Sequence, residues 1–247
     1  MKQVPGCTAR CGARSVGAAF AVVLLAALVP GCAAYGDSSG ELLLDSQARD
    51  AAAGASATYT VTFTTAWTAE VTPGGVPEGA HFSPLIGGVH NADVAFLEPG
   101  GKATPGIESM AERGRTATLT EEIEAAGANA LSVLRKESGS GKTAAASFDS
   151  VTVTADHPLI TLLSMIAPSP DWFVGVFGLS LLDSDGEWIE ALTVDLHPWD
   201  AGTEEGDDFS FDNAASAPHG TITSLQGTGR FADVPIATMT FTLQSGA

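Results

Sequence analysis

The sequence predicts an all-β domain: an antiparallel β-sandwich of about eight strands with a helical insertion near residues 107–136. Three observations lead to this prediction. Short segments in which apolar and polar residues alternate recur along the chain. The chain contains 28 glycines and 13 prolines, which suits short strands joined by many turns. With 247 residues, 45% of them hydrophobic, it is long enough for one sizeable core in a single domain.

The two ends of the predicted domain carry matching strand patterns. In residues 58–64 apolar side chains alternate with threonines, and residues 237–243 repeat this pattern near the C-terminus. Strict alternation is typical of a strand that is buried on one face only. The two segments therefore indicate antiparallel sheets with one face towards water.

Further strands are predicted in the middle of the chain, at residues 151–154, 159–166, 172–182, 188–196 and 222–225. The segment 159–166 is apolar enough to lie in the centre of a sheet. The residues Asp183-Ser184-Asp185-Gly186 are turn-forming by type, so we expect 172–182 and 188–196 to flank a hairpin turn.

One interval departs from the strand pattern. Between Leu119 and Lys136 apolar residues recur every three or four positions, and Thr118 with Glu121 matches a capping box. These features predict a helix over residues 119–136. A shorter helix is predicted over residues 105–113, and a loop rich in Gly, Ser and Ala is predicted over residues 137–146.

Residues 1–31 have the pattern of a signal peptide. Lys2, Arg10 and Arg14 form a basic start, and an apolar run follows over residues 16–29. That run is too short to span a membrane comfortably. We therefore expect the chain to be exported.

Cys32 follows this leader directly, as in bacterial lipoproteins that are cleaved before a cysteine that then carries lipid. The sequence thus predicts a lipid anchor on Cys32, with ordinary secretion as the alternative. Residues 32–57 are rich in Ala, Ser, Gly and Asp and are predicted to be a flexible tether to a domain over residues 58–245. All three cysteines lie at or before position 32, which excludes disulfides and thiol chemistry from that domain.

The charge of the chain is strongly negative. Its 11 basic and 29 acidic residues give a net charge of −18, and three of the basic residues lie in the leader, which leaves −21 for the remainder. This charge argues against nucleic acid or an anionic membrane surface as a partner and favours cations. Solubility or adaptation to salt is an alternative explanation.

Two aspartates stand in turns that contain proline and tryptophan. Asp171 belongs to P-S-P-D-W at residues 168–172, and Asp200 belongs to H-P-W-D at residues 197–200. Calcium binds carboxylates and backbone carbonyls, and the loops of a β-sandwich can bring distant turns together at one end. The sequence therefore makes Asp171 and Asp200 candidate metal ligands. The alternative is that each carboxylate caps its own turn.

A rival prediction is a hydrolase of the cell envelope. His90, His157 and His197 with Ser83 or Ser169 contain the residue types of a catalytic triad. The chain has neither the G-x-S-x-G nucleophile motif nor the H-E-x-x-H zinc motif. A third possibility is a structural surface protein that binds no ligand.

Several motifs together resemble the spondin domain. They are P-S-P-D-W-F-V-G-V at 168–176, D-A-G-T at 200–203, H-F-S-P-L-I-G at 81–87, His90-Asn91 and A-E-R-G at 111–114. The spondin domain is the amino-terminal part of the mindin and F-spondin matrix proteins and also occurs alone in bacterial secreted proteins. The resemblance extends from about Tyr59 to about Leu243.

This resemblance implies a β-sandwich similar to C2 domains, a bound calcium ion (Ca²⁺) and an adhesive role without catalysis. It assigns Asp171 and Asp200 as metal ligands, and Thr152 stands where the family has a third ligand, a glutamate. The implied partner is an unknown extracellular protein or glycan. The implied location is the cell envelope, with membrane contact only through a lipid on Cys32, or else the extracellular space.

Overall fold

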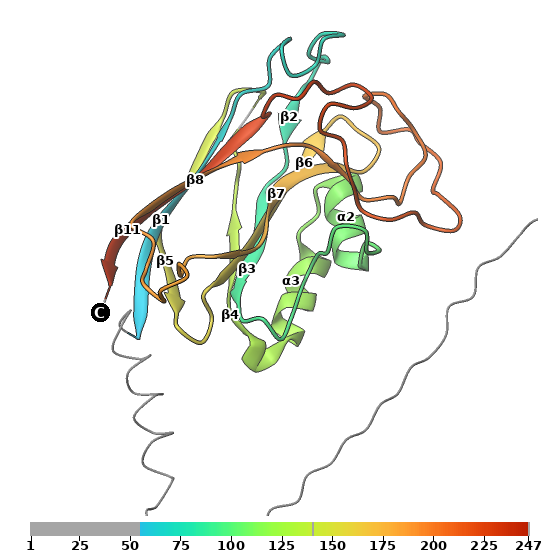
Figure 1. Ribbon diagram of the computed structural model, residues 1–247. Helices are drawn as coiled ribbons and strands as arrows, with labels where there is room; N and C mark the ends of the chain where they lie inside the picture. The colour runs from blue at the N-terminus through green and yellow to red at the C-terminus, as the bar shows by residue number, and fades with distance from the viewer. Residues whose placement is uncertain (1–54, 140, 247) are drawn as a thin grey trace, which may run out of the picture. The chain divides into compact units, whose positions relative to one another are not determined.

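A computed structural model describes residues 55–139 and 141–246 of the chain, which fall in the compact unit Ser39–Ala247 (Figure 1). The predicted signal peptide 1–31 and nearly all of the predicted tether 32–57 lie outside the described residues. No helix within the described ranges is long and apolar enough to cross a membrane.

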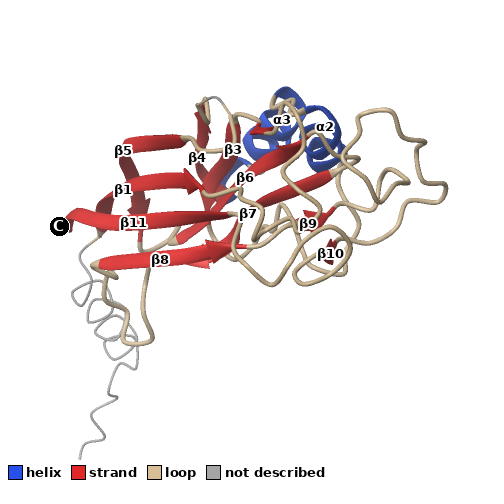
Figure 2. Ribbon diagram, turned by 90° about the horizontal axis from the view of Figure 1, so that it is seen from above, coloured by secondary structure: helices blue, strands red, loops and turns tan. Residues whose placement is uncertain are grey.

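The described chain forms two antiparallel sheets, which confirms the predicted sandwich class (Figure 2). In strand order, the four-stranded sheet consists of β5 (Ala145–Thr154), β1 (Ser56–Thr65), β11 (Ala237–Gly246) and β8 (Ala191–Leu196). The seven-stranded sheet consists of β10 (Thr223–Ser224), β9 (Trp199–Asp200), β7 (Trp172–Ser180), β6 (Leu159–Ala167), β3 (Leu85–His90) and β4 (Ala130–Lys136), with β2 (His81–Phe82) paired to β6.

The first and last strands pair with each other as their matching patterns indicated. Val61 lies opposite Phe241, and Phe63 lies opposite Met239, in the antiparallel pair β1 and β11. All four side chains are buried between the two sheets, whereas the threonines between them point outwards. Burying this apolar surface contributes roughly 25 cal/mol per Å² to folding. The four-stranded sheet therefore has one core face and one wet face.

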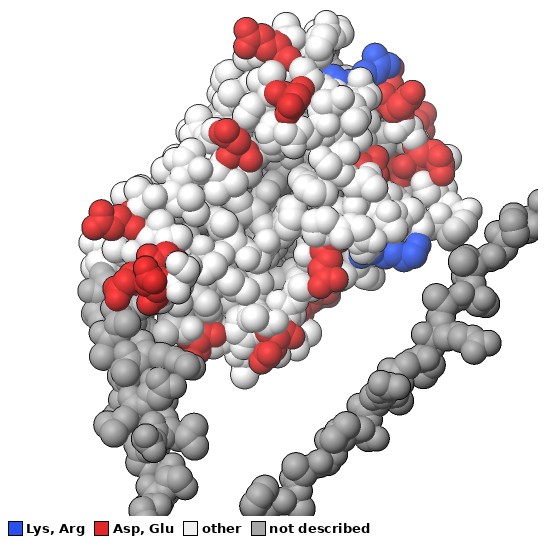
Figure 3. All heavy atoms as spheres, viewed as in Figure 1, with Lys and Arg blue, Asp and Glu red and all other residues white. Residues whose placement is uncertain are grey.

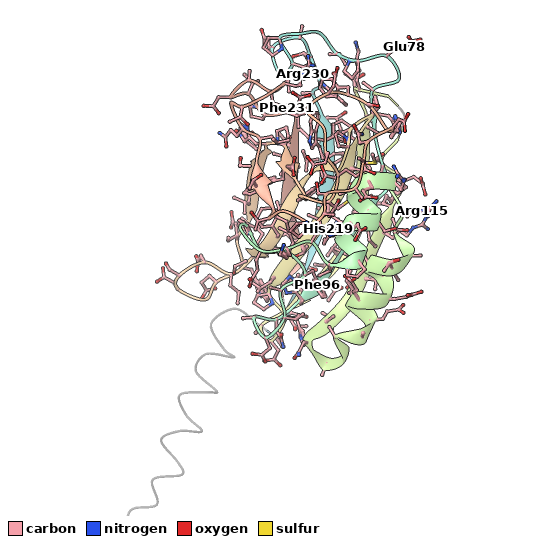
Figure 4. All side chains as sticks on the ribbon, turned by 90° about the vertical axis from the view of Figure 1, so that its right-hand side faces the viewer. Glu78, Phe96, Arg115, His219, Arg230 and Phe231 are labelled. Carbon is pink, nitrogen blue, oxygen red and sulfur yellow. The ribbon has the colours of Figure 1, made fainter. Side chains whose placement is uncertain are left out.

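Two helices, α2 (Pro105–Arg113) and α3 (Ala117–Ala125), cover the outer face of the seven-stranded sheet (Figure 1). Their buried residues Ile107 and Ile123 belong to a second core with Phe173 of β7. Phe96, from the loop after β3, packs into the same core on the helical side of the domain (Figure 4). Because both faces of this sheet are covered, β6 is buried along almost its whole length, as its apolar sequence predicted.

The structure confirms the predicted helix at 105–113 and corrects the one at 119–136. Helix α3 ends at Ala125, and a short 3₁₀ turn, η1 (Gly127–Asn129), follows, in which Gly127 has a left-handed φ of 59°. The chain then continues as β4, where Val133 lies opposite Gly88 of β3. The apolar residues of this segment fit a helical spacing, but pairing with β3 makes it a strand.

The segment 183–186 is a hairpin turn, as predicted, but its arms pair over only a few residues. The Asp183 carboxylate accepts hydrogen bonds from the backbone N–H groups of Asp185 and Glu187, both at 2.9 Å. The two arms pair only next to the turn, through the antiparallel bridge between Leu182 and Trp188 and the backbone hydrogen bonds around it. The chain instead crosses to the other sheet, where β8 pairs with β11, so one edge of β7 and one edge of β8 have no strand beside them over most of their length in the described part of the chain.

Candidate functional site

The turns that contain Asp171 and Asp200 meet at one end of the sandwich. Strand β9 pairs with the start of β7, which places Asp200 opposite Trp172. The backbone N–H of Ala201 donates to the carbonyl of Asp171 at 3.2 Å. The structure therefore brings together two aspartates that are 29 positions apart in the sequence.

Asp171 is fully buried, and its two carboxylate oxygens have different surroundings. Oδ2 accepts hydrogen bonds from Thr203 N (2.6 Å), Thr203 Oγ1 (3.2 Å) and Glu204 N (3.1 Å). Oδ1 is buried and has no hydrogen-bond partner among the described residues. Burial raises the pKa of Asp171, and the hydrogen bonds from Thr203 and Glu204 oppose that rise. One oxygen thus fastens the loop at 203–204, and the other has no partner among the described residues.

Asp200 is partly buried, and its Oδ1 accepts a hydrogen bond from Gly202 N at 2.7 Å. This contact is the turn-capping role that the sequence left as an alternative. Burial, followed by the negative charge of Asp171, raises the pKa of Asp200 from 3.8 to about 6. The two carboxylates therefore repel each other, and a cation beside them would relieve that repulsion.

Glu204 is a third carboxylate at this end of the sandwich that sequence reasoning missed. Its Oε1 lies 3.1 Å from Nη2 of Arg113, and its Oε2 is buried without a hydrogen-bond partner among the described residues. Burial raises the pKa of Glu204, the charge of Glu112 adds to the rise, and Arg113 opposes it. The sequence feature that could have pointed to Glu204 is its position directly after the D-A-G-T turn.

The carboxylate oxygens at this end of the sandwich are donors that suit a hard cation, but they do not form a complete coordination shell. In the part of the chain that the structure describes, no three His, Cys, Asp or Glu side chains converge as a metal-binding group. Asp171 and Glu204 nevertheless each leave one buried carboxylate oxygen unpaired, and such atoms are costly to bury without a partner. Carboxylate oxygens are donors of the kind that Ca²⁺ accepts, together with carbonyls and water.

Thr152 does not belong to this site. It lies on β5 of the four-stranded sheet, where it faces solvent opposite Thr58. The turn after β5 leads directly into the start of β6, whereas Asp171 follows the end of β6, a strand of nine residues. At about 3.3 Å per residue, the two positions are separated by roughly the length of that strand. The assignment of Thr152 as a third ligand is therefore corrected.

The histidines of the rival hydrolase prediction bind backbone and threonine groups. The ring nitrogens of His90 lie 2.9 Å from Thr161 Oγ1 and 2.8 Å from the Asn91 carbonyl. His157 Nε2 lies 2.8 Å from the Ala128 carbonyl. These contacts tie both histidines to neighbouring loops and strands.

The candidate serines also have other partners. Ser83 Oγ accepts a hydrogen bond from Met165 N at 2.9 Å, and Ser169 Oγ accepts one from Trp172 N at 3.1 Å. His197 lies elsewhere, beside β7 and β8, with Nδ1 buried. Across residues 55–139 and 141–246, no hydrogen bond joins either serine to a histidine.

Comparison with known proteins shows the family of this chain. The family model described as Spondin_N matches residues 57–232, so the chain belongs to the spondin N-terminal domain family, as its motifs indicated. Human Spondin-2 is 38% identical over 178 residues, which cover 68% of this chain and 52% of that protein. Chicken (Gallus gallus) Spondin-1 is 31% identical over 195 residues, which cover 76% of this chain and 24% of that protein. The chain thus spans about half the length of the first of these relatives and about a quarter of the second.

The raised pKa of Asp200 predicts an unusual pH dependence of stability without divalent cations. Between pH 3.8 and about 6 the folded state holds a proton on Asp200 that the unfolded state releases. The stability that comes from this bound proton is therefore fully present below pH 3.8 and is lost as the pH rises through about 6. The melting temperature in EDTA should accordingly fall over this range.

Asp200→Asn should flatten this fall and raise the melting temperature in EDTA at pH 7. Thermal unfolding at a series of pH values measures both effects. Asp156→Asn changes an exposed aspartate and serves as the control that keeps the wild-type slope. An equal slope in Asp200→Asn and wild type would contradict the assignment.

Proposed function

We propose that this spondin-family chain is an exported, calcium-binding interaction domain that acts in adhesion at the cell surface. The observation that carries the proposal is the buried, unpaired Oδ1 of Asp171 close to the carboxylate of Asp200. Calcium is the cation that the donor set favours. All its candidate donors are oxygens, and zinc and copper sites are built with Cys or His ligands.

Asp171 and Asp200 would hold the ion, together with backbone carbonyls and water. A calcium ion accepts about six to eight oxygens, so the carboxylates supply part of the shell. When bound, the ion would supply positive charge that offsets the repulsion between Asp171 and Asp200. It would thereby fasten the β6–β7 turn to the loop that follows β9.

An interaction role without catalysis is supported by the family and by the charge of the surface. Acidic side chains are distributed over the face shown in Figure 3, while basic side chains appear at few places on it. Such a surface attracts cations and partners with basic surfaces and repels nucleic acid. The proposed partner is therefore an extracellular protein or glycan that the domain contacts directly or through calcium.

Calcium should raise the melting temperature of the wild-type protein. A ligand that binds only the folded state stabilises it in proportion to the logarithm of its concentration, by about 2.7 kcal/mol at 100 times the dissociation constant. The rise should be much smaller in Asp200→Asn, and smallest in the double variant Asp171→Asn with Asp200→Asn.

Thermal melting across a calcium titration tests this expectation, with magnesium as the competing ion. Asp156→Asn, which removes an exposed carboxylate away from these turns, should respond as the wild type does. A wild-type melting curve that does not change at millimolar calcium would refute the metal site.

Binding to an external partner should depend on calcium. We expect the protein, used as bait, to retain one or more surface components in calcium and to release them in EDTA. Asp200→Asn should retain less of the same components in calcium. If the same components are retained with and without EDTA, binding to the partner does not need calcium, and the calcium part of the proposal is contradicted.

We also propose that Cys32, which lies outside the described residues, carries the lipid anchor. Cells that express the protein with radiolabelled palmitate should label it, and Cys32→Ser should abolish the label and release the protein into the medium. Cys7→Ser, which changes a cysteine inside the predicted leader, is the matched control. Label that persists in Cys32→Ser would exclude this anchor.

A further inference from the structure

A cavity of about 440 Å³ lies between β7 and β8. One wall consists of residues 175–180 of β7, and the other residues that line it are Val194, Asp195, His197, Trp199 and Gln226. Figure 3 shows this face hollowed near its centre, where β7 and β8 run in Figure 1. The cavity exists because the chain crosses from one sheet to the other after β7.

The wall formed by β7 is a free strand edge. On this side β7 pairs with β9 only through Trp172 and Phe173, and the described residues place no strand beside the rest of it. Farther along, Gly178 has a left-handed φ of 61°, and the register with β6 shifts between Ile160 and Leu162. The regular free edge is therefore short, about the length of a few residues of an extended peptide.

Two aromatic rings stand at the cavity. Phe177 and Trp199 have ring centroids 5.3 Å apart and planes at 89°. In a perpendicular pair, the face of one ring meets the edge of the other, and aromatic faces carry negative electrostatic potential. Rings in such a setting attract a cation within about 6 Å of their centres.

Two polar side chains around the cavity can accept hydrogen bonds from a ligand. Asp195 forms no ion pair with any other described residue. The Gln226 amide nitrogen donates to Asp233 Oδ1 at 2.6 Å, which leaves its carbonyl oxygen free to accept. His197, which also lines the cavity, has its Nδ1 buried without a partner among the described residues.

No Lys or Arg is found among the described residues that line this cavity. The chain as a whole has 29 acidic residues against 11 basic ones. Local acceptors, aromatic faces and long-range charge thus all favour the same kind of ligand, an organic cation that donates hydrogen bonds.

We propose that this cavity binds the alkylammonium group of a lysine side chain on an extended segment of a partner polypeptide. The ammonium group lies against Phe177 and Trp199 and pairs with Asp195. The peptide backbone pairs with the free edge of β7, which is the reason to assign a polypeptide and not a free amine. The inference rests on the proposed interaction function for the existence of a partner, but it does not require calcium.

A capped five-residue peptide with lysine at its centre, flanked by valine and threonine, tests this proposal. Titration of the ¹⁵N-labelled protein should shift the indole N–H resonance of Trp199 and the amides along the β7 edge. The same peptide with norleucine in place of lysine should bind about tenfold more weakly, a difference of about 1.4 kcal/mol. Equal affinity of the two peptides would overturn the ammonium assignment.

Asp195→Asn should weaken the lysine peptide about tenfold, because it removes the carboxylate and keeps the shape. Asp185→Asn is the matched control, since this exposed aspartate lies in the 183–186 turn and does not line the cavity. An unchanged affinity in Asp195→Asn would also overturn the proposal. Thermal melting of both variants checks that they remain folded.

Two further arms separate this site from the other proposals. Butylammonium should bind more weakly than the lysine peptide, and equal affinity would overturn the role of the β7 edge. The peptide should bind with equal affinity in calcium and in EDTA. Loss of binding in EDTA would instead place the peptide-binding site at the end of the sandwich that carries Asp171. The calcium-dependent melting described above is unaffected by any of these outcomes, so the two proposals fail separately.

Discussion

The Asp171 carboxylate is the contact on which one end of the sandwich depends. Its Oδ2 receives hydrogen bonds from the backbone of Thr203 and Glu204, although more than 30 residues separate them in the sequence. Hydrogen bonds to a charged acceptor are stronger than neutral ones, and a buried carboxylate without them is very costly. They hold the loop after β9 against the β6–β7 turn, and this places Asp200 near Asp171.

The two-residue strand β9 connects the two proposed sites. Successive side chains of a strand point to opposite faces, so Trp199 and Asp200 face different surroundings. Trp199 packs against Phe177 at the cavity between β7 and β8, and Asp200 lies beside Asp171. A shift of β9 along β7 would therefore alter both sites together. This coupling gives a physical reason for the short H-P-W-D segment to hold one register.

Much of the fold follows from local pattern, and the misses have identifiable causes. Alternating threonines mark β1 and β11, and a proline at its start marks α2. Strand β3 escaped prediction because its centre is Gly87-Gly88, which weakens a strand pattern. The structure explains these glycines, since a Cβ at Gly87 would lie 1.9 Å from the Thr161 carbonyl oxygen of β6. Glycine is required at these positions because neighbouring strands approach closely, and the sequence of a single segment does not show that approach.

The sequence by itself determined the sandwich class, the strand faces, the negative charge and the turns that contain Asp171 and Asp200. These properties depend on residue types, on spacing within one segment and on motifs of the spondin family. Only the tertiary structure decided that the backbone of Glu204 binds the Asp171 carboxylate and that Thr152 faces solvent on another sheet. It also decided that 172–182 and 188–196 belong to different sheets, which opens the cavity beside Trp199. The reason is physical: strand pairing and burial bring distant residues together, and local periodicity contains no information about which strands pair.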